Sequence, residues 1–178
     1  MTLSRRPIAL VGPAALAVVA LNPAAAPARR GDNEEPPMSV LTLAQANAIV
    51  AGALKKAREM KIKPLAVVVL DAAGHLKSAQ REDDATMFRV DIATGKAWAA
   101  VGMGASSRTL LARAKDNPQF FGALSATAQG RFLPQTGAVL IKDKAGIVLG
   151  AAGASGGTGD EDEAACIAGV EAAGLTHG

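Results

Sequence analysis

Hydrophobic positions recur every three or four residues after Thr42, a pattern typical of an amphipathic helix over 43–60. Thr42 and Gln45 have the spacing of a capping box, which favours a helix start at this point. The next apolar residues form an unbroken run over 65–70, and apolar and polar positions then alternate over 76–81. Because the residues between these stretches are typical of a turn, the pattern predicts a β-hairpin.

The second half of the chain repeats this mixture of helical and strand patterns. It predicts a helix within 86–104, one or two short helices within 105–129, a hairpin of strands 138–141 and 147–152, and a last helix over 160–173. No strand–helix–strand alternation occurs, so a doubly wound parallel sheet is not expected. The order of elements favours an α+β fold with helices packed on an antiparallel sheet.

The first 28 residues have the pattern of a secretory signal peptide. Two arginines, Arg5 and Arg6, precede a short apolar run, and the small residues at 26–28 form a cleavage site. The alternatives are an uncleaved anchor or a wrongly assigned start. The paired arginines are also found in twin-arginine signals, so either the Sec or the twin-arginine route would export the protein. We therefore expect a signal peptide at 1–28, a flexible tether at 29–39 and one domain at 40–178.

Charge and cysteine content restrict the function further. Cleavage would remove two arginines and no acidic residue, which lowers the formal net charge from +3 to +1. With no basic stripe, nucleic-acid binding is not expected, and neither is membrane attachment after cleavage. The single cysteine, Cys166, can form neither an intramolecular disulfide nor a thiolate metal cluster, and we expect a buried, inert thiol. A periplasmic or extracellular domain without disulfides depends on packing, which subunit association can extend.

The glycine-rich segment 153–157 matches the G-x-S-x-G pattern of hydrolase nucleophile elbows. However, the following helix is expected to begin only at Asp160, and the one later histidine is His177, at an end that we expect to fray. A phosphate-binding loop is equally disfavoured, because the residues over 160–163 are all acidic and would repel an anion. Thr158 and Glu161 have capping-box spacing, which predicts a structural loop.

Four segments in order resemble the GlcG/HbpS-like haem-binding (haem-degrading) domain family, which includes the C-terminal domain of PduO-type corrinoid adenosyltransferases. They are LTLAQANAIVAGAL at 41–54, AVVVLDAAGHLKSAQREDDA at 66–85, DIATGKAWAA at 91–100 and GIVLGAAGASGGTGDEDEA at 146–164. The resemblance implies a two-layer, PAS/profilin-like α+β fold with about five antiparallel strands. It also implies a homo-oligomer that binds haem or another tetrapyrrole. The chain departs from the family pattern at Ala73, at 82–85 and at 134–139, where local turns can differ.

If the chain binds haem, five side chains are candidates for contacting it. His75 is a candidate axial ligand, and Met87 is a second one. Arg81 and Lys96 match basic positions of the family and are candidates to pair with propionates. Phe120 could form a wall of the slot. Each also has a structural alternative: a surface histidine, a core methionine, salt-bridge partners and a core phenylalanine.

These observations leave three functional hypotheses. The first is an exported, oligomeric domain that binds a haem-like tetrapyrrole, with a possible role in degrading or sensing it. The second is an enzyme acting on a small organic acid, with Lys96 or Arg81 holding the carboxylate. No catalytic residue is assigned, because the adjacent acids Asp83 and Asp84 do not form an acid–base pair. The third is a structural or assembly domain without a ligand.

Overall fold

The computed structural model describes residues 40–178, and the predicted signal peptide and tether lie outside the described residues. Ten elements follow one another along this part of the chain: α1 (Leu43–Glu59), β1 (Ala66–Asp71), β2 (Leu76–Arg81), α2 (Phe88–Met103), α3 (Ser107–Asp116), α4 (Pro118–Thr127), β3 (Ala138–Lys142), β4 (Val148–Ser155), α5 (Gly159–Ala172) and β5 (Thr176–His177). Among these residues, no helix has the length and apolarity needed to cross a membrane.

The strands form one antiparallel sheet in the order β2-β1-β4-β3-β5. Both hairpins are present, which confirms the predicted α+β fold and its five-stranded antiparallel sheet. The centre of the sheet is the β1–β4 pair, in which Ala66 lies opposite Ser155 and Asp71 lies opposite Gly150. β1 therefore begins at the end of the sheet where β4 finishes.

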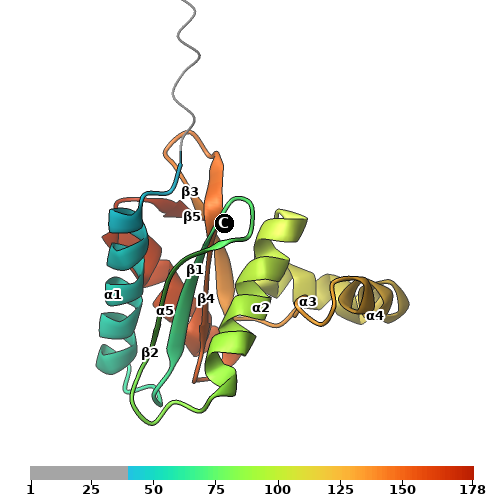
Figure 1. Ribbon diagram of the computed structural model, residues 1–178, viewed down its shortest axis with the longest axis horizontal. Helices are drawn as coiled ribbons and strands as arrows, with labels where there is room; N and C mark the ends of the chain where they lie inside the picture. The colour runs from blue at the N-terminus through green and yellow to red at the C-terminus, as the bar shows by residue number, and fades with distance from the viewer. Residues whose placement is uncertain (1–39) are drawn as a thin grey trace, which may run out of the picture. The chain divides into compact units, whose positions relative to one another are not determined.

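Helices cover both faces of the sheet. The domain therefore has a second helical layer in addition to the two layers that the family resemblance implies. α1 and α5 lie together on one face, and α2 lies on the other (Figure 1). Alternate residues of β1 explain this arrangement: Val67 and Val69 belong to the core under α1 and α5, whereas Val68 and Leu70 belong to the core under α2. An unbroken apolar strand is buried on both sides.

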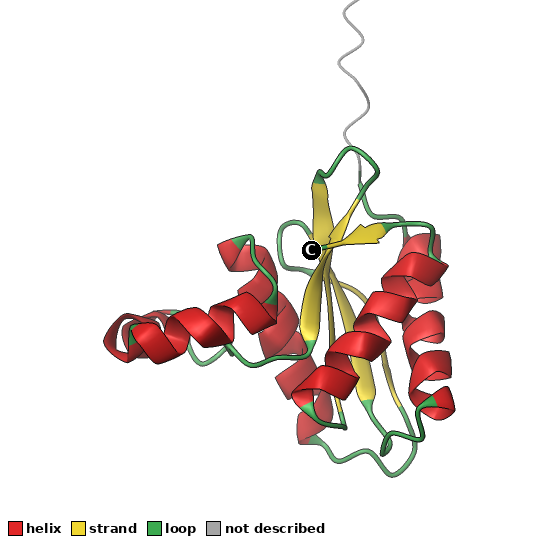
Figure 2. Ribbon diagram, turned by 180° about the vertical axis from the view of Figure 1, so that it is seen from behind, coloured by secondary structure: helices red, strands yellow, loops and turns green. Residues whose placement is uncertain are grey.

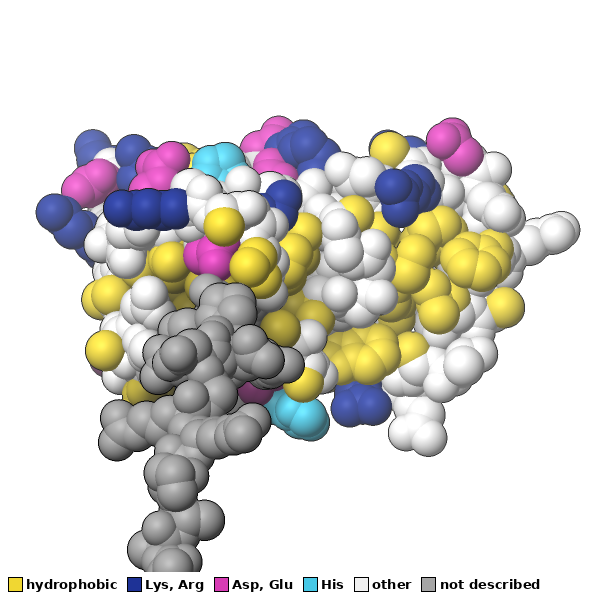
Figure 3. Space-filling view, turned by 90° about the horizontal axis from the view of Figure 1, so that it is seen from above, with side chains coloured by type: hydrophobic (Ala, Val, Ile, Leu, Met, Phe, Trp, Pro, Cys, Tyr) yellow, Lys and Arg dark blue, Asp and Glu magenta, His cyan; other side chains and the backbone are white. Residues whose placement is uncertain are grey.

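α3 and α4 form a helical hairpin that projects from the body of the domain (Figure 2). The Asn117 side chain accepts a hydrogen bond from the Phe120 N–H and Pro118 opens α4, as the sequence predicts for this cap. Phe121 and Phe132 are buried between these helices and α2. Hydrophobic side chains are nevertheless visible over the hairpin in the view from above (Figure 3).

Two ends of strands differ from the expectation. The C-terminus does not fray, because His177 pairs with Ile141 in β5 and the Gly178 N–H donates to the Leu140 carbonyl. β4 continues to Ser155, three residues beyond the predicted strand, where Ala66 of β1 still pairs with it. This extension brings Ser155 to the edge of the site described next.

Candidate functional site

A cleft of about 580 Å³ opens at the end of the sheet where β1 begins and β4 finishes. The first half of α2 forms one wall with Arg89, Ile92 and Lys96, and the segment 133–136 forms another. Ser155 and the loop that leads into α5 close the floor. Its volume falls within the range of small-molecule sites, about 300–1,000 Å³.

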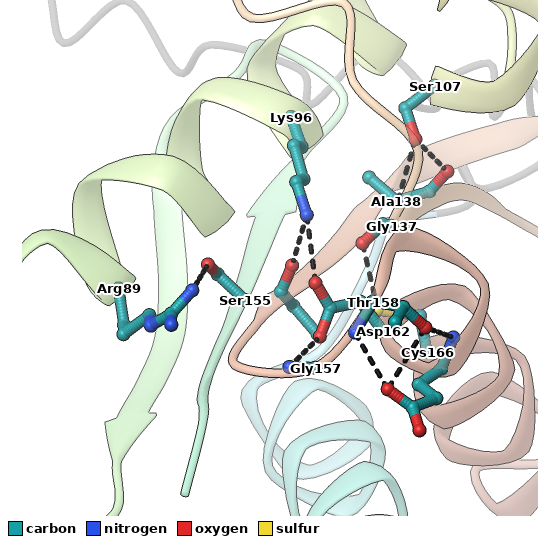
Figure 4. Close-up of polar contacts among 12 residues, drawn as sticks. Arg89, Lys96, Ser107, Gly137, Ala138, Ser155, Gly157, Thr158, Asp162 and Cys166 are labelled. Carbon is teal, nitrogen blue, oxygen red and sulfur yellow. Dashed lines mark hydrogen bonds and ion pairs between the residues drawn. The ribbon is translucent and has the colours of Figure 1, made fainter. Parts of the chain in front are cut away.

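The floor of the cleft contains a buried ion pair between Lys96 and Asp162 (Figure 4). Lys96 Nζ lies 2.9 Å from Asp162 Oδ2 and donates a second hydrogen bond, 3.1 Å long, to the Ala154 carbonyl. The other carboxylate oxygen of Asp162 accepts the Gly157 N–H at 2.9 Å. The two side chains are 6% and 2% exposed, so one pair joins α2, β4, the loop and α5 away from water.

Two neighbours show how closely this ion pair is packed. Gly137 has a φ of +125°, and a Cβ built there would lie 2.6 Å from Lys96 Nζ, so only glycine fits. Cys166 lies on α5, and its thiol is 3.6 Å from the Gly137 carbonyl. Burial raises the pKa of this thiol above its ordinary value, and the Asp162 carboxylate raises it further. The prediction of a buried Cys166 is confirmed.

Arg89 is the cation of the cleft that has no carboxylate partner among the described residues. Its guanidinium donates one hydrogen bond, 3.3 Å long, to Ser155 Oγ (Figure 4). Ser155 is 1% exposed, and its own hydroxyl proton has no acceptor among the described residues. Arg89 is half-buried and lies in the first turn of α2, where the helix dipole disfavours a positive charge.

A second hollow of about 440 Å³ adjoins the cleft and shares Arg89 and Gly157 with it. Lys61 and Lys63 line its outer side. Its one acidic group, Glu161, forms the predicted capping box with Thr158. Hydrogen bonds from the Thr158 backbone N–H and then its hydroxyl lower the pKa of Glu161, so this carboxyl stays ionised at neutral pH.

The remaining acids beside the cleft are held by Arg108 of α3. Its Nε donates to Glu163 Oε2 at 2.7 Å, and its Nη2 lies 2.5 Å from Asp160 Oδ1. The hydrogen bond to Glu163 raises the pKa of the Arg108 guanidinium. The acidic start of α5 is therefore not a uniformly solvated cluster, because Asp162 and Glu163 are buried against cationic partners.

The structure separates the five predicted site residues. Lys96 lies in the cleft, while Arg81 is at the end of β2 and donates to the Ala85 carbonyl. Met87 is 73% exposed just before α2, and Phe120 is 50% exposed on the projecting α4, edge-on to Phe121. His75 follows the β1–β2 turn at the opposite end of the sheet, because β1 begins beside the cleft and ends at Asp71. Five residue steps of β1, about 17 Å, separate the two ends.

The sequence analysis missed the contributions of Arg89 and Asp162. The first turn of a helix favours acidic residues, so a cation at this position of α2 was an unusual feature that could have indicated Arg89. Asp162 was hidden within a run of acids, and nothing in its sequence neighbourhood indicates that Lys96 is its partner. Ser155 was noted only for the G-x-S-x-G match. Three residues separate it from α5, and in the described part of the chain no histidine lines its cleft.

The β1–β2 turn forms a smaller candidate site. Asp71 Oδ1 accepts the N–H groups of Ala73 and His75, each at 2.9 Å, and lies 3.9 Å from His75 Nδ1. The His75 side chain is 80% exposed. Beside the turn lies a hollow of about 310 Å³ with Trp98 in its lining, and the Arg131 guanidinium stacks 4.9 Å from the Trp98 ring centroid.

A five-stranded antiparallel sheet between helical layers, with hollows at both of its ends, defines the class of this protein as a small α+β domain. Residues 41–171 match the family described as haem degrading protein HbpS-like. The chain belongs to this family, as the four sequence segments indicate.

Curated relatives and solved structures agree with this family. The chain is 28% identical over 134 residues to the corrinoid adenosyltransferase PduO of Citrobacter freundii, and the match covers 75% of this chain and 39% of that protein. It thus spans about two fifths of this relative's length. An uncharacterised 15.0 kDa protein from the dhaT–dhaS intergenic region of the same organism is 30% identical over 132 residues, which is 73% of this chain and 89% of the relative.

Solved structures show the same fold. ORFY from Klebsiella pneumoniae has a TM-score of 0.71 and 27% identity, covering 80% of this chain and 96% of that one. A double mutant of HbpS from Streptomyces reticuli has a TM-score of 0.66 and 26% identity, covering 89% and 97%. A solved haem complex of PduOC has a TM-score of 0.69 and 24% identity, covering 77% of this chain and 97% of that one. At this level of identity, it supports the fold alone.

Proposed function

We propose that this protein is an exported haem-binding member of the HbpS-like family and that it acts as a homo-oligomer. Membership of a haem-degrading family supports the ligand. A solved relative of the same fold was crystallised as a haem complex, which is consistent with the ligand class. The signal-like pattern at 1–28 supports export to the periplasm or the extracellular space.

The observation that carries the proposal is the accessible imidazole of His75. Haem iron is usually held by a histidine, methionine or cysteinate. Cys166 is fully buried and its raised thiol pKa disfavours the thiolate, so it is a poor ligand. His75 presents its ring to solvent, and its Nδ1 lies 3.9 Å from Asp71 Oδ1, close enough for this carboxylate to move into hydrogen-bond distance when Nε2 binds a metal. Haem bound at His75 would supply a redox-active iron.

The groups around His75 support the same ligand. Trp98 offers an aromatic surface in the hollow beside the turn, and the Arg131 guanidinium, which stacks on the Trp98 ring, offers a cation for a propionate. The larger cleft fits haem less well, because among the described residues its lining contains no histidine, methionine or cysteine. Lys96 and Arg81, which were candidates for the propionates, donate to Asp162 and to the Ala85 carbonyl instead.

The size of the hollow supports the homo-oligomer. At about 310 Å³ it lies at the lower limit of ligand pockets, which bury most of the surface of a drug-sized ligand. One subunit would therefore cover only part of a macrocycle, and a second copy would complete the slot. The exposed Leu76, next to His75 at the start of the edge strand β2, is available for such a contact.

A haemin titration followed by absorbance tests the proposal. We expect saturable binding with a shifted Soret band, and His75→Ala weakens binding at least about tenfold, while His177→Ala, the matched histidine control, does not. Size-exclusion chromatography with light scattering of the same samples measures the subunit number. Non-saturating binding, or an unchanged Soret band and affinity in His75→Ala, would overturn the assignment of the site. A monomer in both the free and the haem-saturated state would overturn the oligomer.

A further inference from the structure

We propose that the cleft around Arg89 is a second binding site, separate from His75, and that it takes a small organic carboxylate with an apolar body. Two hollows of about 580 and 440 Å³ meet at Arg89 and Gly157. Neither contains His75, and the site lies at the opposite end of the sheet from the β1–β2 turn.

Charge balance favours an anion. In the first hollow, Asp162 is neutralised by Lys96 and Asp160 is paired with Arg108. In the second, Glu161 is satisfied by its capping box, whereas Lys61 and Lys63 have no carboxylate partner among the described residues. Arg89 lies where the two hollows meet, and it also has no carboxylate partner among the described residues. The joined hollows thus expose cations whose charge is unpaired and carboxylates that already have partners.

Unused hydrogen-bond donors point to the same ligand. Arg89 carries five N–H groups and uses one, toward the hydroxyl of Ser155. Ser155 keeps its own hydroxyl proton available, and Lys96 uses two of its three N–H groups. A carboxylate accepts hydrogen bonds with both oxygens and fits the fork of a guanidinium, so it matches this donor set.

The apolar side chains that line the first hollow indicate the chemistry of the rest of the ligand. Ile92, Leu111 and Leu133 contribute to the first hollow and are each partly exposed. Inorganic phosphate or sulfate would leave these side chains in contact with water, whereas a short alkyl or aromatic body would cover them. A small carboxylate of this kind uses both the cationic junction and the apolar wall.

The test is a titration of the purified protein with pentanoate, followed by the shifts of backbone amide signals in NMR spectra. The neutral isostere pentanamide and inorganic sulfate serve as matched probes. We expect pentanoate to shift the amides of Gly157 and Thr136 in a saturable way, and pentanamide and sulfate to bind at least about tenfold more weakly. Arg89→Gln should weaken pentanoate binding about tenfold, which corresponds to about 1.4 kcal/mol. Arg89→Lys should retain part of the affinity, because it keeps the charge but loses the planar fork.

Arg113→Gln is the control, since Arg113 is an exposed arginine of α3 outside both hollows. Thermal unfolding of each variant shows whether Arg89→Gln remains folded. Equal binding of pentanamide, equal binding of sulfate, equal losses in the two Arg→Gln variants, or no saturable shift with pentanoate would each overturn the carboxylate site. A haemin titration of Arg89→Gln separates the two proposals: unchanged haem binding is expected, and a loss comparable to that of His75→Ala would show that the sites are not independent.

Discussion

The Lys96–Asp162 pair leads to a prediction whose size follows from its burial. Removal of one member of a buried ion pair leaves an uncompensated charge and costs about 3–5 kcal/mol. The two side chains are 6% and 2% exposed, so water cannot solvate the remaining charge without a local opening of the domain. Lys96→Met leaves the Asp162 carboxylate charged, with the Gly157 N–H as its remaining partner. Asp162→Asn leaves the Lys96 ammonium beside neutral acceptors alone, the Ala154 carbonyl and the new amide, with no negative charge to compensate it.

Urea unfolding followed by the fluorescence of Trp98 measures this cost. With a slope of about 2 kcal/mol per molar urea, a loss of 3–5 kcal/mol lowers the midpoint by about 2 M. The control is Lys56→Met on α1, whose ion pair with Glu59 is 3.9 Å long and exposed at both ends. We expect that variant to lose no more than about 0.5 kcal/mol, or about 0.25 M.

The double variant Lys96→Met/Asp162→Asn tests the coupling directly. Because neither charge remains, its loss should be smaller than the sum of the two single losses by about 2 kcal/mol. If each single variant moved the midpoint no more than Lys56→Met does, the ion pair would not be a buried, mutually dependent unit. A double variant whose loss equals the sum would refute the reasoning equally.

Two further predictions concern α5 and α4. Gly169→Ala places a Cβ 2.4 Å from the Ile49 carbonyl and should destabilise the protein by about 1–3 kcal/mol. Gly122→Ala, with open space around it, should be neutral or stabilise α4 by up to about 1 kcal/mol. Equal urea midpoints for the two variants would contradict this difference. The lowered pKa of Glu161 means that its stabilisation is present above pH 4.5 and is lost as the pH falls through the lower folded value. The midpoint difference between the wild type and Glu161→Gln should therefore shrink on acidification, and a constant difference would be inconsistent with the capping-box assignment.

Local patterns predicted most of the fold. The capping boxes at Thr42 and Thr158 mark the starts of α1 and α5, and the turns 71–74 and 142–146 separate the strands of the two hairpins. The unbroken run 65–70 also contained the information that helices cover both faces, because a strand without polar positions must be buried on both sides. The two-residue strand β5 has no such signature, since its pairing depends on β3 being nearby.

The site was much less predictable than the fold. Lys96 and Asp162 are 66 residues apart, and so are Arg89 and Ser155. Each pair forms because α2 crosses the end of β4, and Gly153 permits this approach: a Cβ there would lie 2.3 Å from the Ala93 carbonyl. No periodicity or spacing encodes such long-range contacts. Residue type indicated His75 as a candidate, and the family resemblance indicated Arg81 and Lys96, but neither shows which of them share a surface.

The buried ion pair also explains why the loop between β4 and α5 can form one side of a cleft. A buried salt bridge adds little net stability compared with apolar packing, so its role is better sought in the conformation that it selects. Asp162 binds Lys96 through one oxygen and the Gly157 N–H through the other, and Lys96 binds the Ala154 carbonyl. These three bonds hold the chain on both sides of Ser155 against α2. The Ser155 hydroxyl is thereby kept beside Arg89, and a ligand that binds there would not have to order the loop first.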